Sequence, residues 1–165
     1  MTSSDNFTEK EWKMLVFSPS FTANNVASSD GSISKNETLK ITQTLLKARD
    51  RYTKDHLIYL ILSDLPDMIE AQDFPGELRY IKTLDEAERA YKKLGKIVDS
   101  KASSQEARDY KLFIITIAES VANASGGFFQ LFGEPVSTEE GQYCTLIRQA
   151  FGLPISPNQV NHDNK

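Results

Sequence analysis

The sequence contains few of the residues that most often carry chemistry. Its 165 residues include one cysteine, Cys144, and two histidines, His56 and His162. One cysteine cannot form a disulfide within the chain, and the set is too small for a zinc site of cysteine and histidine ligands. We therefore expect a reducing, cytoplasmic environment for the protein.

Long apolar runs and an excess of basic charge are also missing. The longest apolar run, Leu57–Leu62, is far shorter than the roughly 20 residues that cross a bilayer as a helix. The first residues are polar and do not predict a signal peptide. A formal charge of −4 argues against a surface that binds nucleic acid. The sequence thus predicts no transmembrane segment and no nucleic-acid partner.

The composition suits one compact domain. The chain is 39% hydrophobic and 10% aromatic, and its length lies within the roughly 100–200 residues of a typical domain. Such a chain can bury a substantial core. Because both ends are polar, we expect a single domain over residues 7–153 and frayed tails at residues 1–6 and 155–165.

Helix starts are the most frequent pattern. Five segments read Ser/Thr-x-x-Glu, and each precedes a stretch with helical apolar spacing. In such a capping box the hydroxyl accepts a backbone N–H bond, and the glutamate accepts one from the capping residue. The pattern predicts an all-α fold, a bundle of about seven helices. The five boxes begin at Thr8, Ser34, Thr83, Ser103 and Ser137.

Apolar periodicity places further boundaries. The first helix continues through Pro19, which predicts one helix kinked at that residue. Residues 53–62 are expected to form a short buried helix. Residues 63–82 contain two prolines and a glycine, which predict a loop with at most a short helical turn. Gly152 and Pro154 indicate the end of the last helix.

A wide apolar stripe surrounds Tyr110 and predicts that its helix is the central one. The glycines of Ser125-Gly-Gly127 are expected to end that helix. The next residues include Phe128, Phe129 and Phe132, which either fold back onto the core or, if exposed, form a surface for a protein partner.

One turn has the spacing of part of a calcium-binding loop. Asp30 would take position 5, Gly31 position 6 and Glu37 position 12 of an EF-hand. Position 1, which normally supplies a carboxylate, would be Val26. We therefore favour a tight turn followed by a capping box, and keep a divalent cation as the alternative.

No catalytic set is apparent. Cys144 is interpreted as a small buried residue, and His56 as a packed or surface histidine. The sequence shows no phosphate-binding glycine loop, no HExxH motif and no Ser/His/Asp set. We therefore predict that the protein is not an enzyme. A hydrolase would need a polar pocket with converging ionisable groups.

Two turns are similar to each other, and together they resemble a known family. The first reads Val26-Ala-Ser-Ser-Asp30-Gly31-x-Ile33-Ser34-x-x-Glu37. The second reads Val121-Ala-x-Ala124-Ser125-Gly126-Gly127-Phe128, followed by Val136-Ser137-x-x-Glu140. Their likeness suggests a pseudo-two-fold pair of helix–turn–helix units. With the first helix near Trp12, the chain resembles the TerB-like tellurite-resistance family.

The resemblance implies a cytosolic, all-helical, non-catalytic domain linked to tellurite resistance and stress responses. It also implies an acidic surface for a divalent cation, at the positions Asp30, Glu37 and Glu140. The chain departs from the family at Ser29, where members often carry alanine, and in its long connection over residues 63–82.

Two functional hypotheses follow. The first is a stress protein that binds a cation near Asp30 and Glu37. The second is a helical module that binds a protein partner through an apolar groove or the phenylalanine-rich segment.

Overall fold

The computed structural model describes residues 2–28, 35–79, 81–130 and 138–155, without the side chains of residues 35–40, 42, 123–130, 138 and 140. Over these residues the fold is all-α, with seven α-helices and no strand, which confirms the predicted fold class. None of the helices described combines the length and apolarity needed to cross a membrane. The helices are α1 (Glu9–Ala27), α2 (Lys35–Arg49), α3 (Leu57–Ala71), α4 (Gly76–Arg79), α5 (Leu84–Lys101), α6 (Ser104–Gln130) and α7 (Thr138–Ala150).

Capping boxes begin α1 and α5 as predicted. The Glu11 carboxylate accepts the Thr8 N–H at 2.8 Å, and Thr8 Oγ1 accepts the Glu11 N–H at 3.3 Å. Thr83 and Glu86 form the same reciprocal pair. These local hydrogen bonds satisfy N–H groups that have no partner within a helix. The serines of two other predicted boxes, Ser34 and Ser137, lie outside the described residues.

The box before α6 joins distant parts of the chain. Ser103 Oγ and Thr2 Oγ1 each donate to Glu106 Oε2 at 2.6 Å. Burial raises the Glu106 pKa, but the hydrogen bonds from Ser103 and Thr2 outweigh it and lower the pKa overall. Thr2 is only 5% exposed. The expectation of a frayed tail at residues 1–6 therefore differs from the structure for residues 2–6, because a buried carboxylate holds their start.

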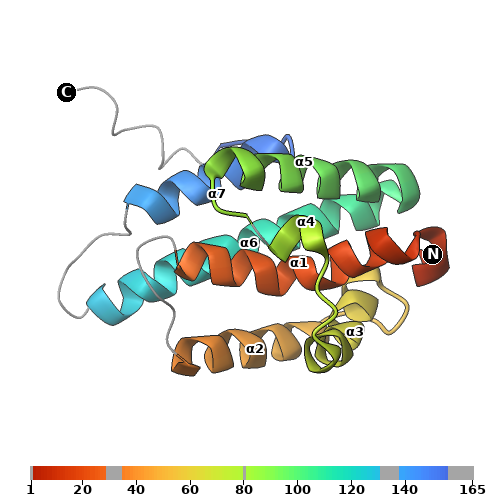
Figure 1. Cartoon of the computed structure of the whole chain (residues 1–165), viewed down its shortest axis with the longest axis horizontal. Coiled ribbons are helices and arrows are strands. Elements are labelled where there is room, and N and C mark those ends of the chain that lie inside the picture. Colours follow the sequence, from red (N-terminus) through yellow and green to blue (C-terminus); the bar gives the residue numbers. More distant parts are fainter. Residues whose placement is uncertain (1, 29–34, 80, 131–137, 156–165) are drawn as a thin grey trace.

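The centre of the bundle belongs to α1. This helix packs against each of the other six α-helices and crosses the middle of the molecule (Figure 1). It is one continuous helix that includes the buried Pro19, as the periodicity predicted. The prediction that the Tyr110 helix is central was wrong: α6 packs mainly on α1, α3, α5 and α7.

Two helices are longer than the sequence indicated. α3 runs to Ala71 and includes Pro66, so the loop predicted from residue 63 begins only after Ala71. α3 persists through Pro66 because its apolar face is buried, and its contact with α1 offsets the lost backbone hydrogen bond. α6 continues through Gly126 and Gly127 to Gln130, so the expectation that these glycines end it was also wrong. The buried residues of α3 are Leu57, Ile58, Ile61, Leu62 and Leu65.

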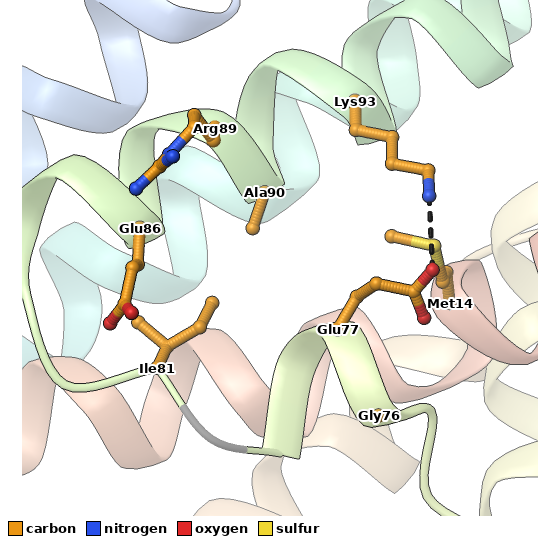
Figure 2. Close-up of a pocket in the computed structure, with 8 residues that line it drawn as sticks. All are labelled: Met14, Gly76, Glu77, Ile81, Glu86, Arg89, Ala90 and Lys93. Atoms are coloured by element: carbon orange, nitrogen blue, oxygen red, sulfur yellow. Dashed lines mark hydrogen bonds and ion pairs between the residues drawn. The ribbon is translucent and has the colours of Figure 1, made fainter.

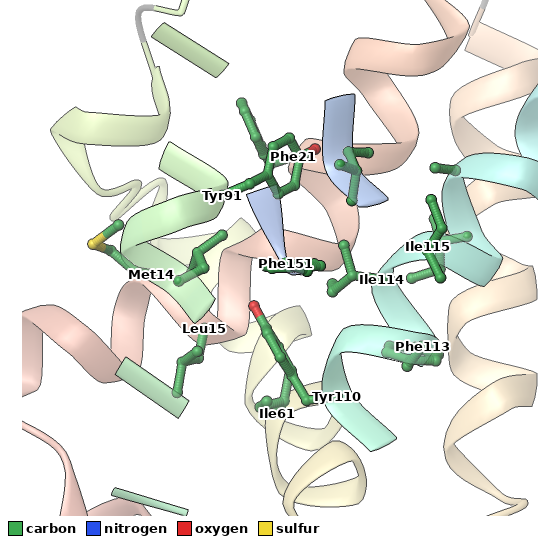
Figure 3. Packing of buried hydrophobic residues seen from close by; sticks show 14 of the residues in the cluster. Met14, Leu15, Phe21, Ile61, Tyr91, Tyr110, Phe113, Ile114, Ile115 and Phe151 are labelled. Atoms are coloured by element: carbon green, nitrogen blue, oxygen red, sulfur yellow. The ribbon is translucent and has the colours of Figure 1, made fainter. Parts of the chain in front are cut away.

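Aromatic rings and hydroxyl groups share the core, as Figure 3 shows. The Tyr91 ring lies 5.7 Å from that of Phe151, nearly perpendicular to it. The Tyr110 hydroxyl lies 2.8 Å from Ser18 Oγ, and the Tyr91 hydroxyl donates to Thr22 Oγ1 at 3.0 Å. Both contacts supply hydrogen-bond partners for buried hydroxyls, which would otherwise destabilise the fold.

Candidate functional site

The described residues do not include the side chains that were predicted to bind a cation. Asp30 lies outside the described residues. Glu37 and Glu140 belong to α2 and α7, but their side chains lie outside the description. Among the described residues, no group of three or more His, Cys, Asp or Glu side chains could hold a metal ion. The cation site stays a prediction.

The predicted phenylalanine surface also stays a prediction. Phe128 and Phe129 fall in the last turns of α6, and their side chains are not described. Phe132 lies outside the described residues, as do the two turns of the proposed pseudo-two-fold pair, at residues 29–34 and 131–137.

His56 and Cys144 are packed as the sequence suggested. His56 Nδ1 accepts the Ile58 N–H at 3.1 Å and caps α3, while Nε2 lies 3.4 Å from Asp109 Oδ2. The Tyr52 ring packs on the imidazole at 4.7 Å. Both ring nitrogens of His56 therefore have structural roles. Cys144 is 2% exposed, in α7.

The described surface instead contains a groove beside α4. One hollow of about 320 Å³ lies between α1, α4 and α5, and a second of about 590 Å³ continues from it along the start of α1. The two share Gly76 and Glu77. We call them together the α4 groove. The first is lined by Met14, Gly76, Glu77, Ile81, Glu86, Arg89, Ala90 and Lys93 (Figure 2).

The short helix α4 is held in place by apolar residues. Leu78 is 3% exposed, and α4 packs on α1. The Pro75 carbonyl accepts the N–H groups of Leu78 and Arg79. Just before it, the Phe74 ring lies 4.8 Å from that of Phe17. These contacts hold α4 beside α5 and create the groove between them.

The floor of the first hollow is apolar. Met14 is fully buried, Ala90 is 7% exposed, and Ile81 is partly buried. In Figure 2, Ala90 lies on α5 between Arg89 and Lys93 and points toward the space that Ile81 borders. An apolar floor with polar groups around it is typical of sites that bind another molecule.

Two lysines converge on one carboxylate at the junction of the hollows. Glu77 Oε1 lies 2.6 Å from Lys10 Nζ and 3.1 Å from Lys93 Nζ. The hydrogen bond from Lys10, against the opposing effect of burial and with help from Lys93, lowers the Glu77 pKa to about 2. The three groups carry a net charge of +1 at neutral pH.

The other carboxylate of the first hollow, that of Glu86, accepts hydrogen bonds from the backbone. Glu86 Oε2 accepts the N–H of Lys82 at 2.8 Å and that of Thr83 at 3.1 Å. These backbone hydrogen bonds lower the Glu86 pKa. Arg89 uses Nε to donate to the Asp85 carbonyl at 3.3 Å, and its side chain is exposed.

Sequence reasoning missed the α4 groove because its residues lie 60 or more positions apart in places. No sequence pattern singled out Met14, and Glu77 lay in a predicted loop. The only local signal was Leu78, an apolar residue just after Pro75-Gly76, which suits a helical turn that docks on the core.

Comparison of the chain with models of known families, with curated proteins and with solved structures finds no match. The TerB-like resemblance therefore rests on the sequence motifs alone.

Proposed function

We propose that this chain is a non-enzymatic helical domain that acts by binding, and that the α4 groove receives a segment of a partner protein. The observation that carries the proposal is the apolar floor of Ala90 and Ile81, above the buried Met14, within a charged rim. An apolar side chain of a partner would lose water there, and the rim would orient its backbone.

The rim supports binding rather than catalysis. Glu77 is held by two lysines, and Glu86 is held by backbone N–H groups. A general base needs a proton-accepting group that can reach a substrate. Carboxylates that already accept several donors, with lowered pKa values, are poor bases at neutral pH.

Glycine substitutions provide a sharp test. Gly76 lines both hollows, and a Cβ there would meet no atom within 4 Å. Gly76→Leu should therefore fill the groove without disturbing the fold. Gly141 in α7 also has open space at its Cβ, so Gly141→Leu is the matched control.

A displayed library of random dodecapeptides would be selected against the folded chain. We expect the enriched peptides to bind the original chain and Gly141→Leu alike, and to lose at least tenfold in affinity for Gly76→Leu, about 1.4 kcal/mol. Equal affinity for both variants, or a library without enrichment, would refute the α4 groove as the binding site.

The role implied by the family resemblance is a separate proposal. We propose that Asp30, Glu37 and Glu140 supply oxygen ligands to a divalent cation in a stress-related function, supported by the two similar turns. Calorimetric titration with Ca²⁺, Mn²⁺ and Zn²⁺ should show one binding event that Glu37→Gln weakens. No heat at millimolar metal would exclude it.

A further inference from the structure

Charge is unevenly distributed between the helices of this chain. The whole chain carries −4, yet residues 76–101, which span α4, α5 and the connection between them, contain seven Lys or Arg and five Asp or Glu. By contrast α3 contains three acidic residues and no basic one. The α4 groove therefore lies in the basic part of an acidic protein.

The acidic groups within the groove are already satisfied. Glu77 accepts from Lys10 and Lys93, and Glu86 accepts from two backbone N–H groups. Glu9, which lines the second hollow, accepts from Lys13. The excess charge that remains is positive, because two ammonium groups share the single carboxylate of Glu77. A ligand carboxylate placed there would meet both of these ammonium groups.

Arg89 adds a second attraction for a carboxylate. Its Nε donates to a backbone carbonyl, which fixes the direction of the side chain. The terminal nitrogens of a guanidinium can bind a carboxylate through two parallel hydrogen bonds. Arg89 and Lys93 lie one turn apart on α5 and line the same hollow, on either side of Ala90 (Figure 2).

From this arrangement, and on the basis of the function proposed above, we propose that the partner segment is an acidic peptide. Its apolar side chain occupies the floor at Ala90 and Ile81, above the buried Met14, and its flanking carboxylates bind Arg89 and the Lys10–Lys93 pair. Charge of this kind on the rim selects partners and speeds association more than it adds affinity.

Three labelled decapeptides test the proposal, each with two central leucines. The leucines are flanked on each side by four glutamates, four glutamines or four lysines. Fluorescence anisotropy and amide chemical shifts of the ¹⁵N-labelled chain would measure affinity and location. We expect the glutamate peptide to bind at least tenfold more tightly than the glutamine peptide at low salt, and the difference to shrink with added salt.

Charge-removing variants localise the effect on one helix. Lys96 lies on the same helix as Lys93, is exposed, and does not line the groove. Lys93→Gln and Arg89→Gln should each lower the affinity for the glutamate peptide about fivefold. This factor corresponds to about 1 kcal/mol, the contribution of a partly exposed ion pair. Lys96→Gln should change its affinity less than twofold.

The outcomes separate this inference from the proposed function. If the glutamine or the lysine peptide binds the groove as tightly as the glutamate peptide, with loss in Gly76→Leu, acidic selectivity is wrong and the groove remains a binding site. If no peptide shifts the amides of Gly76 and Ala90, both proposals fail.

Discussion

The central helix α1 makes two contrasting contacts. Toward α6 the Ser18 hydroxyl is fully enclosed: Ser18 is 0% exposed and contacts the hydroxyl of the buried Tyr110. Toward α4 its charged residues stay in water, and Lys10 is 67% exposed while it contacts Glu77. The α1–α6 contact is closed, and the α1–α4 contact is open.

The difference shows which contact maintains the fold and which can exchange partners. A buried hydroxyl that loses its partner keeps the full cost of leaving water, so the α1–α6 contact tolerates little change. Exposed ion pairs contribute little to stability, because water competes with each partner. The α4 side can therefore open its ion pairs to a ligand without weakening the core.

The largest expected effect is at Tyr110 in the closed contact. Tyr110→Ala should lower the free energy of unfolding by about 3–5 kcal/mol, since it leaves a cavity in the core. Tyr110→Phe should cost only about 1 kcal/mol, because Ser18 still donates to the Leu15 carbonyl. Urea unfolding, followed by the fluorescence of the single tryptophan, Trp12, measures both.

Lys10→Ala, in the open contact, serves as the comparison. We expect its free energy of unfolding to stay within about 0.5 kcal/mol of the original chain. A cost equal to that of Tyr110→Ala would contradict the distinction between the two contacts.

Substitution of either of two glutamates with similar pKa values should have a smaller effect on the free energy of unfolding. The Glu11 pKa is lowered to about 2, chiefly by the hydrogen bond from Lys101 and then by the Thr8 backbone. Glu77 in the α4 groove has a pKa of about 2 through Lys10. At neutral pH, Glu11→Gln should cost about 1 kcal/mol, because it also weakens the cap of α1. Glu77→Gln should cost less.

The pH dependence of unfolding gives the sign of these contributions. A carboxylate whose pKa is lowered by folding stabilises the folded state above its unfolded pKa, near 4.5. That stability is lost as the pH falls toward 2. Unfolding measured between pH 7 and pH 2 should therefore show a shallower decline for Glu11→Gln than for the original chain. Glu70→Gln, at an exposed site on α3, controls for the charge; an equal change there would refute the assignment to Glu11.

The smallest effect is expected at Tyr143 in α7. Its buried hydroxyl has no hydrogen-bond partner among the described residues, unlike those of Tyr91 and Tyr110. Tyr143→Phe should therefore leave the free energy of unfolding unchanged or raise it by up to about 1 kcal/mol. A loss similar to that of Tyr110→Phe, in the same urea experiment, would show that the hydroxyl is needed.

Local sequence patterns were sufficient to predict helix starts and ends where the stabilising contacts are also local. The Thr8–Glu11 and Thr83–Glu86 boxes place the starts of α1 and α5, since each closes within three residues. Gly152, with its φ of 67°, follows the last helix as predicted. In these cases the hydrogen-bond partner or the backbone preference belongs to the neighbouring residues.

Patterns misled where tertiary packing outweighs local preference. Pro66 is in helix α3 because five apolar residues of that helix are buried in the core. The candidate cation and phenylalanine sites came from short motifs, and the α4 groove could not be found this way. Its lining residues come from three helices, α1, α4 and α5, and from a connection, and these segments share no motif.

The sequence by itself determined that this chain forms helices, where α1, α5 and α6 begin, and that its cysteine is a packed residue. These features depend on hydrogen bonds and apolar spacing within a few residues. Only the tertiary structure decided that α1 is central, that Thr2 reaches Glu106, and that Lys10 and Lys93 meet at Glu77. Such pairings depend on how the helices pack, because packing brings together charges that are distant in the chain.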